Sequence, residues 1–379
     1  MKINLAEENQ NYRIWNNIMN EKFWVALSSI EQLNSELILR LYNHFQDIER
    51  AFYVTYNDLK EIDGISKKKA ETFLNIRDKL DLDKIYNYVI ENGIEVVAYE
   101  NPNYPVMLKE IDNPPAVLYV KGDLNSCNLN KTVAVVGSRK ASFNGKESLK
   151  LILKDLANTD ICIVSGLASG IDTTAHHSAI ENNLKTIGVI ASGFDFTYPE
   201  SNRALYQSIQ HGAGAVITEY YPTFEPLKFR FPERNRIVTG LSYGTIVVEA
   251  ALKSGALISA NLTLEQNREL MCIPGLISNP NTKGIYKLIK NGATIVTEGE
   301  DILNALNWEV KIPEQKKLFF ADLTEDEQKV ISAIEVEPKV FDNIQKETNI
   351  QTDDLLACLT TLELKGIIKQ VEGDRYQKV

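Results

Sequence analysis

The stretch KTVAVVGSR (131–139) opens the part of this sequence whose pattern is easiest to interpret. It is a short apolar run, rich in β-branched residues, that ends in a glycine and two polar residues. Near-continuous apolar runs of this length are typical of strands buried on both faces of a sheet. The sequence therefore predicts a doubly wound α/β domain with a parallel sheet over residues 131–307. Six similar runs follow, each spaced for a crossover helix, at 161–166, 186–193, 214–220, 245–250, 269–275 and 293–299.

The first 130 residues have a different pattern. Residues 1–80 are predicted to form a helical, SAM-like module, and residues 81–130 a connector that packs on the core and contains strands at 94–100 and 115–122. Within the helical module, LKEIDGISKKKAETFL (59–74) reads as helix, glycine turn, helix. A helix–hairpin–helix of this kind can hold a DNA phosphate on its turn amides. The alternative is a small helical packing module.

The C-terminal residues form a third pattern. Residues 308–323 are polar and predict a linker. Residues 324–379 predict three helices, followed by the alternating stretch IIKQVEGDRYQKV (367–379), which indicates a β-hairpin. Three helices and a hairpin of this size predict a winged helix. Residues 320–379 contain 7 basic and 13 acidic residues, a net charge of −6.

Composition and charge limit the class of protein. Of the 379 residues, 44% are hydrophobic and 24% charged, which is typical of globular domains. The sequence has no apolar run long enough to span a bilayer, and the first ten residues carry acids where a signal peptide needs an apolar stretch. We therefore expect a cytoplasmic protein without membrane contact. The four cysteines lie far apart, which argues against a disulfide framework or a zinc site.

The charge is unevenly distributed along the chain. The formal net charge is −10, which argues against indiscriminate binding of polyanions. Residues 131–300, however, contain 17 basic and 15 acidic residues and are the net-basic part of the chain, at +2. A polyanion is therefore expected to bind within the α/β domain.

Glycine, serine and arginine residues follow three of the predicted strands. Because the carboxyl ends of parallel strands meet at one edge of a sheet, these residues are expected to lie close together. Glycines let a backbone approach a ligand, amides at helix starts attract anions, and an arginine suits a phosphate. The sequence therefore predicts a phosphate pocket at this edge. Its candidate residues are Gly137, Ser138, Arg139, Ser165, Gly166, Ser192 and Gly193.

A basic and aromatic run, LKFRFPERNR (227–236), is a second candidate for DNA contact. Arg234 and Arg236 are expected near the start of a helix, where positive charge opposes the helix dipole and favours a bound anion. Either phenylalanine, Phe229 or Phe231, could stack on a base, and the alternative is that both fill the core. The cations of the run are Lys228, Arg230, Arg234 and Arg236.

Common catalytic and cofactor motifs are missing. The sequence has neither a GxGxxG fingerprint after the first strand nor a GxxxxGK[ST] loop, and Ser165 does not lie in a GxSxG motif. His176 and His177 are adjacent on a predicted helix, so they point about 100° apart and do not form a two-ligand metal face. Asp172 is expected to cap a loop, and Glu249 has no identifiable partner. We therefore predict no cofactor, no metal and no catalytic residue.

Six motifs occur in one order along the central domain, and together they resemble those of the DNA-processing protein A family, also called DprA or Smf. They are VAVVGSR (133–139), SGLASGID (165–172), SGFDFTYPESNRALYQSI (192–209), FPERNRIVTGLS (231–242), VVEAALKSGALISANLTLEQNRELMCIPG (247–275) and TKGIYKLIKNGA (282–293).

The resemblance carries expectations about fold and function. It implies an extended Rossmann domain between a helical module and a winged helix. It also implies a protein without established catalytic activity that binds single-stranded DNA, protects it, dimerises through the Rossmann domain and loads the recombinase RecA in natural transformation. Arg139 is similar to the phosphate-binding arginine of the family. The other positions that match its motifs are Ser138, Gly166, Gly170, Phe196, Tyr198, Asn202, Arg234 and Arg236.

The stretch SGALISANLTLEQ (254–266) is rich in small and apolar residues, so its helix is expected either to form the dimer contact or to pack within one subunit. The leading hypothesis is a DNA-binding recombination mediator. The alternatives are an enzyme acting on a nucleotide phosphate, and a nucleotide sensor that uses the same pocket.

Overall fold

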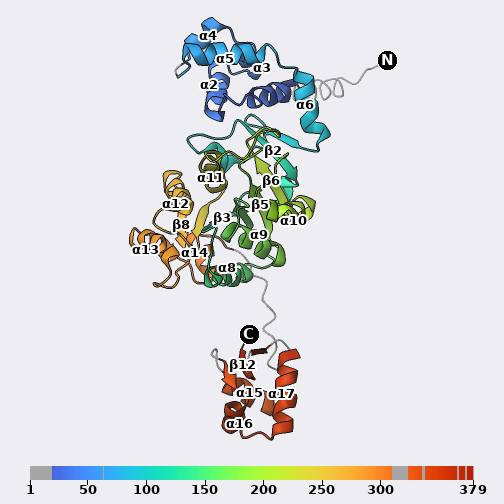
Figure 1. Ribbon diagram of the computed structural model, residues 1–379, viewed down its shortest axis with the longest axis vertical. Coiled ribbons are helices and arrows are strands. Elements are labelled where there is room, and N and C mark those ends of the chain that lie inside the picture. Colours follow the sequence, from blue (N-terminus) through green and yellow to red (C-terminus); the bar gives the residue numbers. More distant parts are fainter. Residues whose placement is uncertain are drawn as a thin grey trace, which may run out of the picture. The chain divides into compact units, whose positions relative to one another are not determined.

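The computed structural model describes residues 19–62, 64–309, 323–334, 338–364, 367–371 and 374–378. They fall into two compact units, one within Met1–Pro313 and one within Glu314–Val379 (Figure 1). The predicted linker at 308–323 lies mostly outside the described residues. In the described part of the chain, no helix is both long and apolar enough to cross a membrane.

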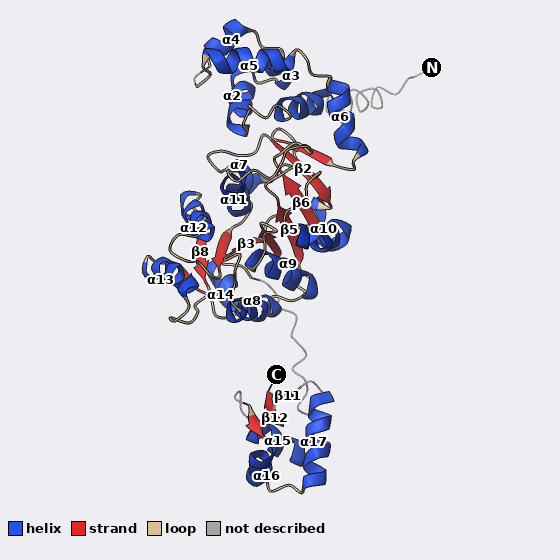
Figure 2. Cartoon of the chain, viewed as in Figure 1, coloured by secondary structure: helices blue, strands red, loops and turns tan. Residues whose placement is uncertain are grey.

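A nine-stranded sheet forms the centre of the first unit (Figure 2). Its order is β1-β2-β6-β5-β4-β3-β7-β8-β9, with β3 to β9 parallel and β1 and β2 added antiparallel beside β6. The predicted parallel sheet is confirmed. The strands are β1 (Glu95–Ala98), β2 (Val117–Gly122), β3 (Thr132–Val136), β4 (Cys162–Ser165), β5 (Lys185–Val189), β6 (Gly214–Thr218), β7 (Gly244–Val247), β8 (Glu269–Cys272) and β9 (Thr294–Ile295).

Helices cover both faces of this sheet because the central strands are apolar on both sides. In β3, Ala134 and Val136 face one layer, and Val133 and Val135 face the other. The first layer contains α7 (Val106–Lys109), α11 (Arg230–Gly240), α12 (Gly255–Glu265) and α13 (Lys283–Lys290). The second contains α8 (Phe143–Asp155), α9 (Ile171–Glu181) and α14 (Gly299–Ala305), with α10 (Arg203–Ser208) packed beside them over β6.

The chain order of the strands fixes where a ligand site is expected. The chain runs outward from β3 through β4 and β5 to β6, and then returns to place β7 on the other side of β3. Such a reversal leaves a crevice at the carboxyl ends of the strands, which is where ligands bind in open α/β sheets. Four short helical turns complete the loops: η1 (Leu124–Ser126), η2 (Glu200–Asn202), η3 (Ile209–Ala213) and η4 (Pro280–Thr282).

The N-terminal helices share a core with the antiparallel edge of the sheet. Trp24 is fully buried and its indole N–H donates to Glu100 Oε1 at 3.0 Å, while the Ser28 and Tyr119 hydroxyls lie 2.6 Å apart. The predicted glycine turn is present at Gly64, which has a φ of +84°. The helices are residues 19–28, α2 (Ser35–Phe45), α3 (Ile48–Phe52), α4 (Tyr56–Lys60), α5 (Lys67–Arg77) and α6 (Leu82–Glu91).

The second unit has the predicted three helices and hairpin. Val330, Ile344, Leu355 and Leu359 are among the buried residues of its core. The winged-helix prediction is therefore confirmed. Its elements are α15 (Glu325–Ala333), β10 (Lys339–Val340), α16 (Phe341–Thr348), α17 (Thr352–Leu364), β11 (Ile368–Val371) and β12 (Arg375–Lys378).

Candidate nucleic-acid interface

A hollow of about 620 Å³ lies at the carboxyl ends of β3 and β4, between the loops that follow them and the starts of α11 and α12. We call it the first hollow. It occupies the crevice that the strand order predicts. Its polar and charged lining residues are Ser138, Arg139, Asp172, Tyr198, Lys228, Arg234, Asn235, Ser254 and Ser259.

Glycines allow the two strand-end loops to touch. Gly170 has a φ of +87°, and a Cβ there would lie 2.3 Å from the Ser138 carbonyl oxygen. A Cβ on Gly137 would lie 2.5 Å from the Ile171 side chain. Neither position can therefore hold a larger residue. At Gly137 the reason is the close approach of the neighbouring side chain, and at Gly170 the left-handed backbone is a second reason. The loops after β3 and β4 form one interlocked wall of the first hollow.

The floor of the first hollow holds two buried side chains of opposite charge, Arg234 and Asp172. Arg234 is 4% exposed and donates from Nη1 to the carbonyl oxygens of Gly166, at 2.6 Å, and Val189. The Asp172 carboxylate accepts from the Ala168 amide at 3.3 Å, as expected for a loop cap. Burial raises the pKa of Asp172 to about 6, although the nearby Arg234 and Arg139 act in the opposite direction. Burial also lowers the pKa of Arg234.

The rim of the first hollow combines cations with aromatic rings. The Arg139 guanidinium lies 5.1 Å from the centre of the Phe231 ring, which meets Tyr198 edge-on at 5.3 Å. Tyr198 is 48% exposed, and Arg139 and Lys228 are exposed. Neither cation has an ion-pair partner among the residues that the structure describes. The rim can therefore offer positive charge to a phosphate and a ring face to a planar group.

The start of α12 contributes groups that sequence reasoning missed. Ser254 precedes the helix without capping it, and its buried hydroxyl has no hydrogen-bond partner within the described residues. The first amides of a helix also lack intrahelical partners. Together with Gly255 and Ser259 this helix start lines the first hollow. The signal was the Ser-Gly pair after a strand, which resembles the pairs that were selected at 165–166 and 192–193.

Several predicted residues lie beside the first hollow and support it. Ser165 is buried and donates to the Val135 carbonyl at 2.7 Å, and the Asn202 amide donates to the Leu167 carbonyl at 2.9 Å. Gly193 donates its amide to the Phe224 carbonyl at 2.8 Å. None of these three residues lines the first hollow, and neither do Gly166, Gly170, Ser192 and Phe196.

Arg230 and Arg236 point away from the first hollow, against the N-terminal helices and the sheet. Arg230 is 2% exposed and forms an ion pair with Glu31 at 2.6 Å, and Arg236 forms one with Glu219. The interpretation that Arg234 and Arg236 need a bound anion near a helix start is therefore wrong. Because α11 begins at Arg230, both lie beyond its first turn. Arg234 donates to two backbone carbonyls and Arg236 Nη2 pairs with Glu219, while Arg236 Nη1 has no hydrogen-bond partner among the described residues.

The histidine pair has a structural explanation. His176 is fully buried, with Nδ1 2.7 Å from the Thr186 hydroxyl, and burial lowers its pKa to about 3. It therefore packs as a neutral core residue. No cluster of three or more histidine, cysteine or acidic residues suited to a metal occurs in the parts of the chain that the structure describes.

Comparisons with known proteins decide the family. The family model for DNA recombination-mediator protein A matches residues 95–307. The chain belongs to that family. The model for the DprA winged-helix domain matches residues 320–374, which agrees with the fold of the second unit. The resemblance to DprA and Smf is thus confirmed.

Relatives match over nearly the whole chain. Protein Smf of Synechocystis is 31% identical across 94% of this chain and 98% of its own length, and protein Smf of Escherichia coli is 31% identical across 94% and 95%. The X-ray structure of DprA from Streptococcus pneumoniae superimposes with a TM-score of 0.66 at 34% identity, covering 80% of this chain and 98% of the other.

A second family structure concerns DNA binding. It is DprA of Helicobacter pylori, described by its single-stranded DNA binding mode. It matches with a TM-score of 0.50 at 29% identity, covering 56% of this chain and 95% of the other.

Proposed function

We propose that this chain binds single-stranded DNA in the first hollow. A phosphate would lie between Arg139, the Ser254 hydroxyl and the first amides of α12, and a base would stack on Tyr198 or Phe231. The single observation that carries the proposal is the unpaired cation Arg139, held over the Phe231 ring at the crevice of the sheet. The binding mode named for the Helicobacter pylori relative supports it.

The proposed preference for single strands follows from the shape of the first hollow. A base must leave its stack and its partner to reach an aromatic ring inside a hollow, which costs less for a single strand than for a duplex. Titration with a labelled oligothymidine, single-stranded and then annealed to its complement, tests this. We expect the single strand to bind at least tenfold more tightly. Equal affinities would contradict the proposal.

The affinity for DNA should depend on pH through Asp172. The pKa of this carboxyl is raised to about 6, so it is ionised at neutral pH and adds negative charge to the floor of the proposed phosphate site. Protonation removes that repulsion, and the affinity is therefore expected to rise a few-fold as the pH falls from 8 to 5. Asp172→Asn should bind with the higher affinity at both values. An equal pH response in the variant would contradict this assignment.

The proposed role is binding without catalysis. The Asp172 carboxylate is committed to the Ala168 amide, and buried Glu249 accepts from both the amide and the hydroxyl of Ser142. Incubation with nucleoside monophosphates is therefore expected to release no free base. Release of base would favour the alternative of a nucleotide-processing enzyme.

We further propose that the chain protects incoming DNA and loads RecA on it in natural transformation. Membership of the recombination-mediator family supports this role. The expected result is faster RecA filament formation on strands that already carry a single-strand-binding protein, together with slower nuclease digestion. No acceleration of RecA loading would contradict the mediator role while leaving DNA binding intact.

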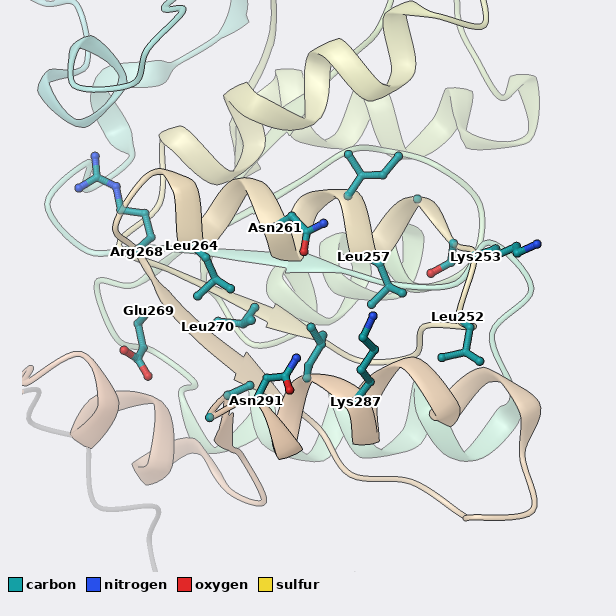
Figure 3. A pocket seen from close by; sticks show the side chains of 16 residues that line it. Leu252, Lys253, Leu257, Asn261, Leu264, Arg268, Glu269, Leu270, Lys287 and Asn291 are labelled. Carbon is teal, nitrogen blue, oxygen red and sulfur yellow. The ribbon is translucent and has the colours of Figure 1, made fainter.

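We propose a homodimer through a groove between α12, α13 and β8. The groove has a volume of about 620 Å³, and Figure 3 shows Leu257 of α12 and Lys287 of α13 pointing into it. Leu252 and Leu264, which line this groove and not the first hollow, are 56% and 55% exposed. Their apolar surface can pack against a second copy.

The dimer prediction is tested by a charge on this surface. Because a buried aspartate opposite its symmetry mate costs several kcal/mol, Leu264→Asp should convert a dimer to a monomer at micromolar concentration. Sedimentation of the full chain measures this. The exposed Leu151→Asp on α8 is the control and should leave the mass unchanged. A wild-type monomer at tens of micromolar would contradict the dimer.

The C-terminal unit is proposed to engage protein instead of duplex DNA. The start of α17 carries Asp353 and Asp354, both exposed, so phosphates near it would be repelled. Truncation after Lys317 should therefore leave the single-strand affinity within about threefold, a change below roughly 0.7 kcal/mol. A loss of more than tenfold would restore a DNA-binding role for this unit.

A further inference from the structure

A second hollow, of about 220 Å³, lies at the same edge of the sheet as the first. The ends of β7 and β8 and the start of α8 surround it. The loop 138–142 separates the two hollows, because Arg139 lines the first and Ser142 lines the second. Since β3 lies next to β7 in the sheet, the two hollows are neighbours along one edge.

Exposed apolar side chains lie on the two segments that line the second hollow: Ser142 and Asn144, on either side of Phe143, both line it, and so does Leu276, which precedes Ile277. Phe143, the first residue of α8, is 76% exposed. Leu276 lines the second hollow at 59% exposure, and the adjacent Ile277 is 83% exposed. A large aromatic side chain this exposed contributes little to the packing of its own chain. Its ring face is available to a planar group.

The floor of the second hollow is polar and negative. Glu249 is 2% exposed and accepts from the Ser142 hydroxyl at 2.5 Å and from the Asn279 amide at 2.9 Å. The Ser142 amide also donates to Glu249 Oε2 at 3.0 Å, so three of the roughly four acceptor sites of the carboxylate are used. The remaining site, on Oε2, can accept one N–H bond, and the negative charge disfavours a phosphate. All four DNA bases carry an N–H donor on the pairing edge, so the floor suits a base and does not select strongly among them.

Cations surround the second hollow without entering it. Lys140 and Lys283 are exposed, and Lys146 is partly exposed in the first turn of α8. The Lys140 carbonyl accepts from the Asn281 amide at 3.2 Å, which brings loop 138–142 beside the segment that leads to Lys283. None of the three lysines has an ion-pair partner within the ranges that the structure describes. They offer positive charge outside the second hollow, while its floor carries negative charge.

We propose that a single strand bound in the first hollow continues across loop 138–142 and stacks a base on Phe143 over the second hollow. The backbone phosphates follow the three lysines, and the pairing edge of the base points towards Glu249. The proposal rests on the proposed function, because the second hollow extends the same binding surface. Neighbouring strands lie about 4.8 Å apart, so the ends of the pair β3 and β4 and of the pair β7 and β8 are about 10 Å apart, a distance that a few nucleotides can span.

The test compares Phe143→Ala with Leu151→Ala in the full chain. Leu151 is 65% exposed on the same helix, two turns further on, so it is a similarly exposed apolar side chain without a ring. Stacking of one base on an aromatic ring contributes about 1–3 kcal/mol, which corresponds to about five- to 150-fold in affinity. We expect Phe143→Ala to lower the affinity for a long oligothymidine by at least fivefold and Leu151→Ala to leave it unchanged.

A cross-linking measurement locates the base. An oligonucleotide that carries 5-bromodeoxyuridine is irradiated with the wild-type chain, and the attached peptide is expected to contain Phe143. An unchanged affinity for Phe143→Ala, or cross-links that never reach its peptide, would overturn the proposal. If Arg139→Glu weakens binding while Phe143→Ala does not, DNA binding in the first hollow is supported and only the proposed stacking on Phe143 is contradicted. A Phe143→Ala variant that binds DNA normally but assembles poorly with RecA would instead assign the surface to a protein.

Discussion

Replacing Arg139 by glutamate is expected to weaken the binding of single-stranded DNA by about ten- to a hundredfold. Arg139 is exposed at the rim of the first hollow, so the substitution should not disturb folding. A hydrogen bond to a charged group contributes about 1.5–3 kcal/mol, and a glutamate adds repulsion to the loss. Fluorescence anisotropy of a labelled oligothymidine at several salt concentrations measures both the affinity and its salt dependence.

The salt dependence gives this prediction a second readout. Each neutralised phosphate contributes about 0.7 to the slope of log affinity against log salt for single strands, so the slope should fall by about that amount. Lys154→Glu is the control, because Lys154 is exposed near the end of α8, away from the strand ends. An unchanged affinity and slope in a folded Arg139→Glu variant would remove the first hollow from the DNA path.

Replacing Arg234 by methionine should have the largest effect on stability. The side chain is buried, and its loss leaves Asp172 without the stronger of its two cationic neighbours and the carbonyls of Gly166 and Val189 without this donor. Removing one partner of a buried charged pair costs about 3–5 kcal/mol. Urea denaturation should show this decrease in the free energy of unfolding.

Two further variants identify the cause. Arg203→Met, which removes an exposed guanidinium paired with Glu200 on α10, should have little effect. Adding Asp172→Asn to Arg234→Met should recover part of the lost stability, because the uncompensated charge is removed as well. A loss below about 1 kcal/mol in Arg234→Met would mean that the buried pair is not needed for the fold.

The sequence was sufficient for the fold because its strongest signal is periodic. The apolar runs after Lys131 are continuous and regularly spaced. Such strands must be buried on both faces, which predicts a parallel sheet independently of the loop sequences. The winged helix could likewise be predicted from the alternating stretch around Gly373. The antiparallel β1 and β2 were predicted as strands, but their place beside β6 depends on long-range pairing that no local pattern encodes.

The candidate site was predictable in part. Arg139 and its neighbours were found because strand ends share an edge. The arginines of the run 227–236 were harder, since successive charged residues on one helix point in different directions. Arg234 enters the floor of the first hollow, while Arg230 and Arg236 pair with Glu31 and Glu219, which lie far away in the sequence. Such partners follow from tertiary packing and not from spacing.

The interlocked glycine loops also have a kinetic consequence. Gly137 and Gly170 pack against their neighbours with no space for a Cβ, so this wall of the first hollow is arranged before a ligand arrives. A preformed site spares the ligand the cost of ordering loops and needs no slow opening step. The rate of encounter with a strand is then set by diffusion and by charge. The rim cations attract the strand locally, while the overall charge of −10 repels it. Differences in affinity between DNA sequences should therefore arise mainly from how long each strand stays bound.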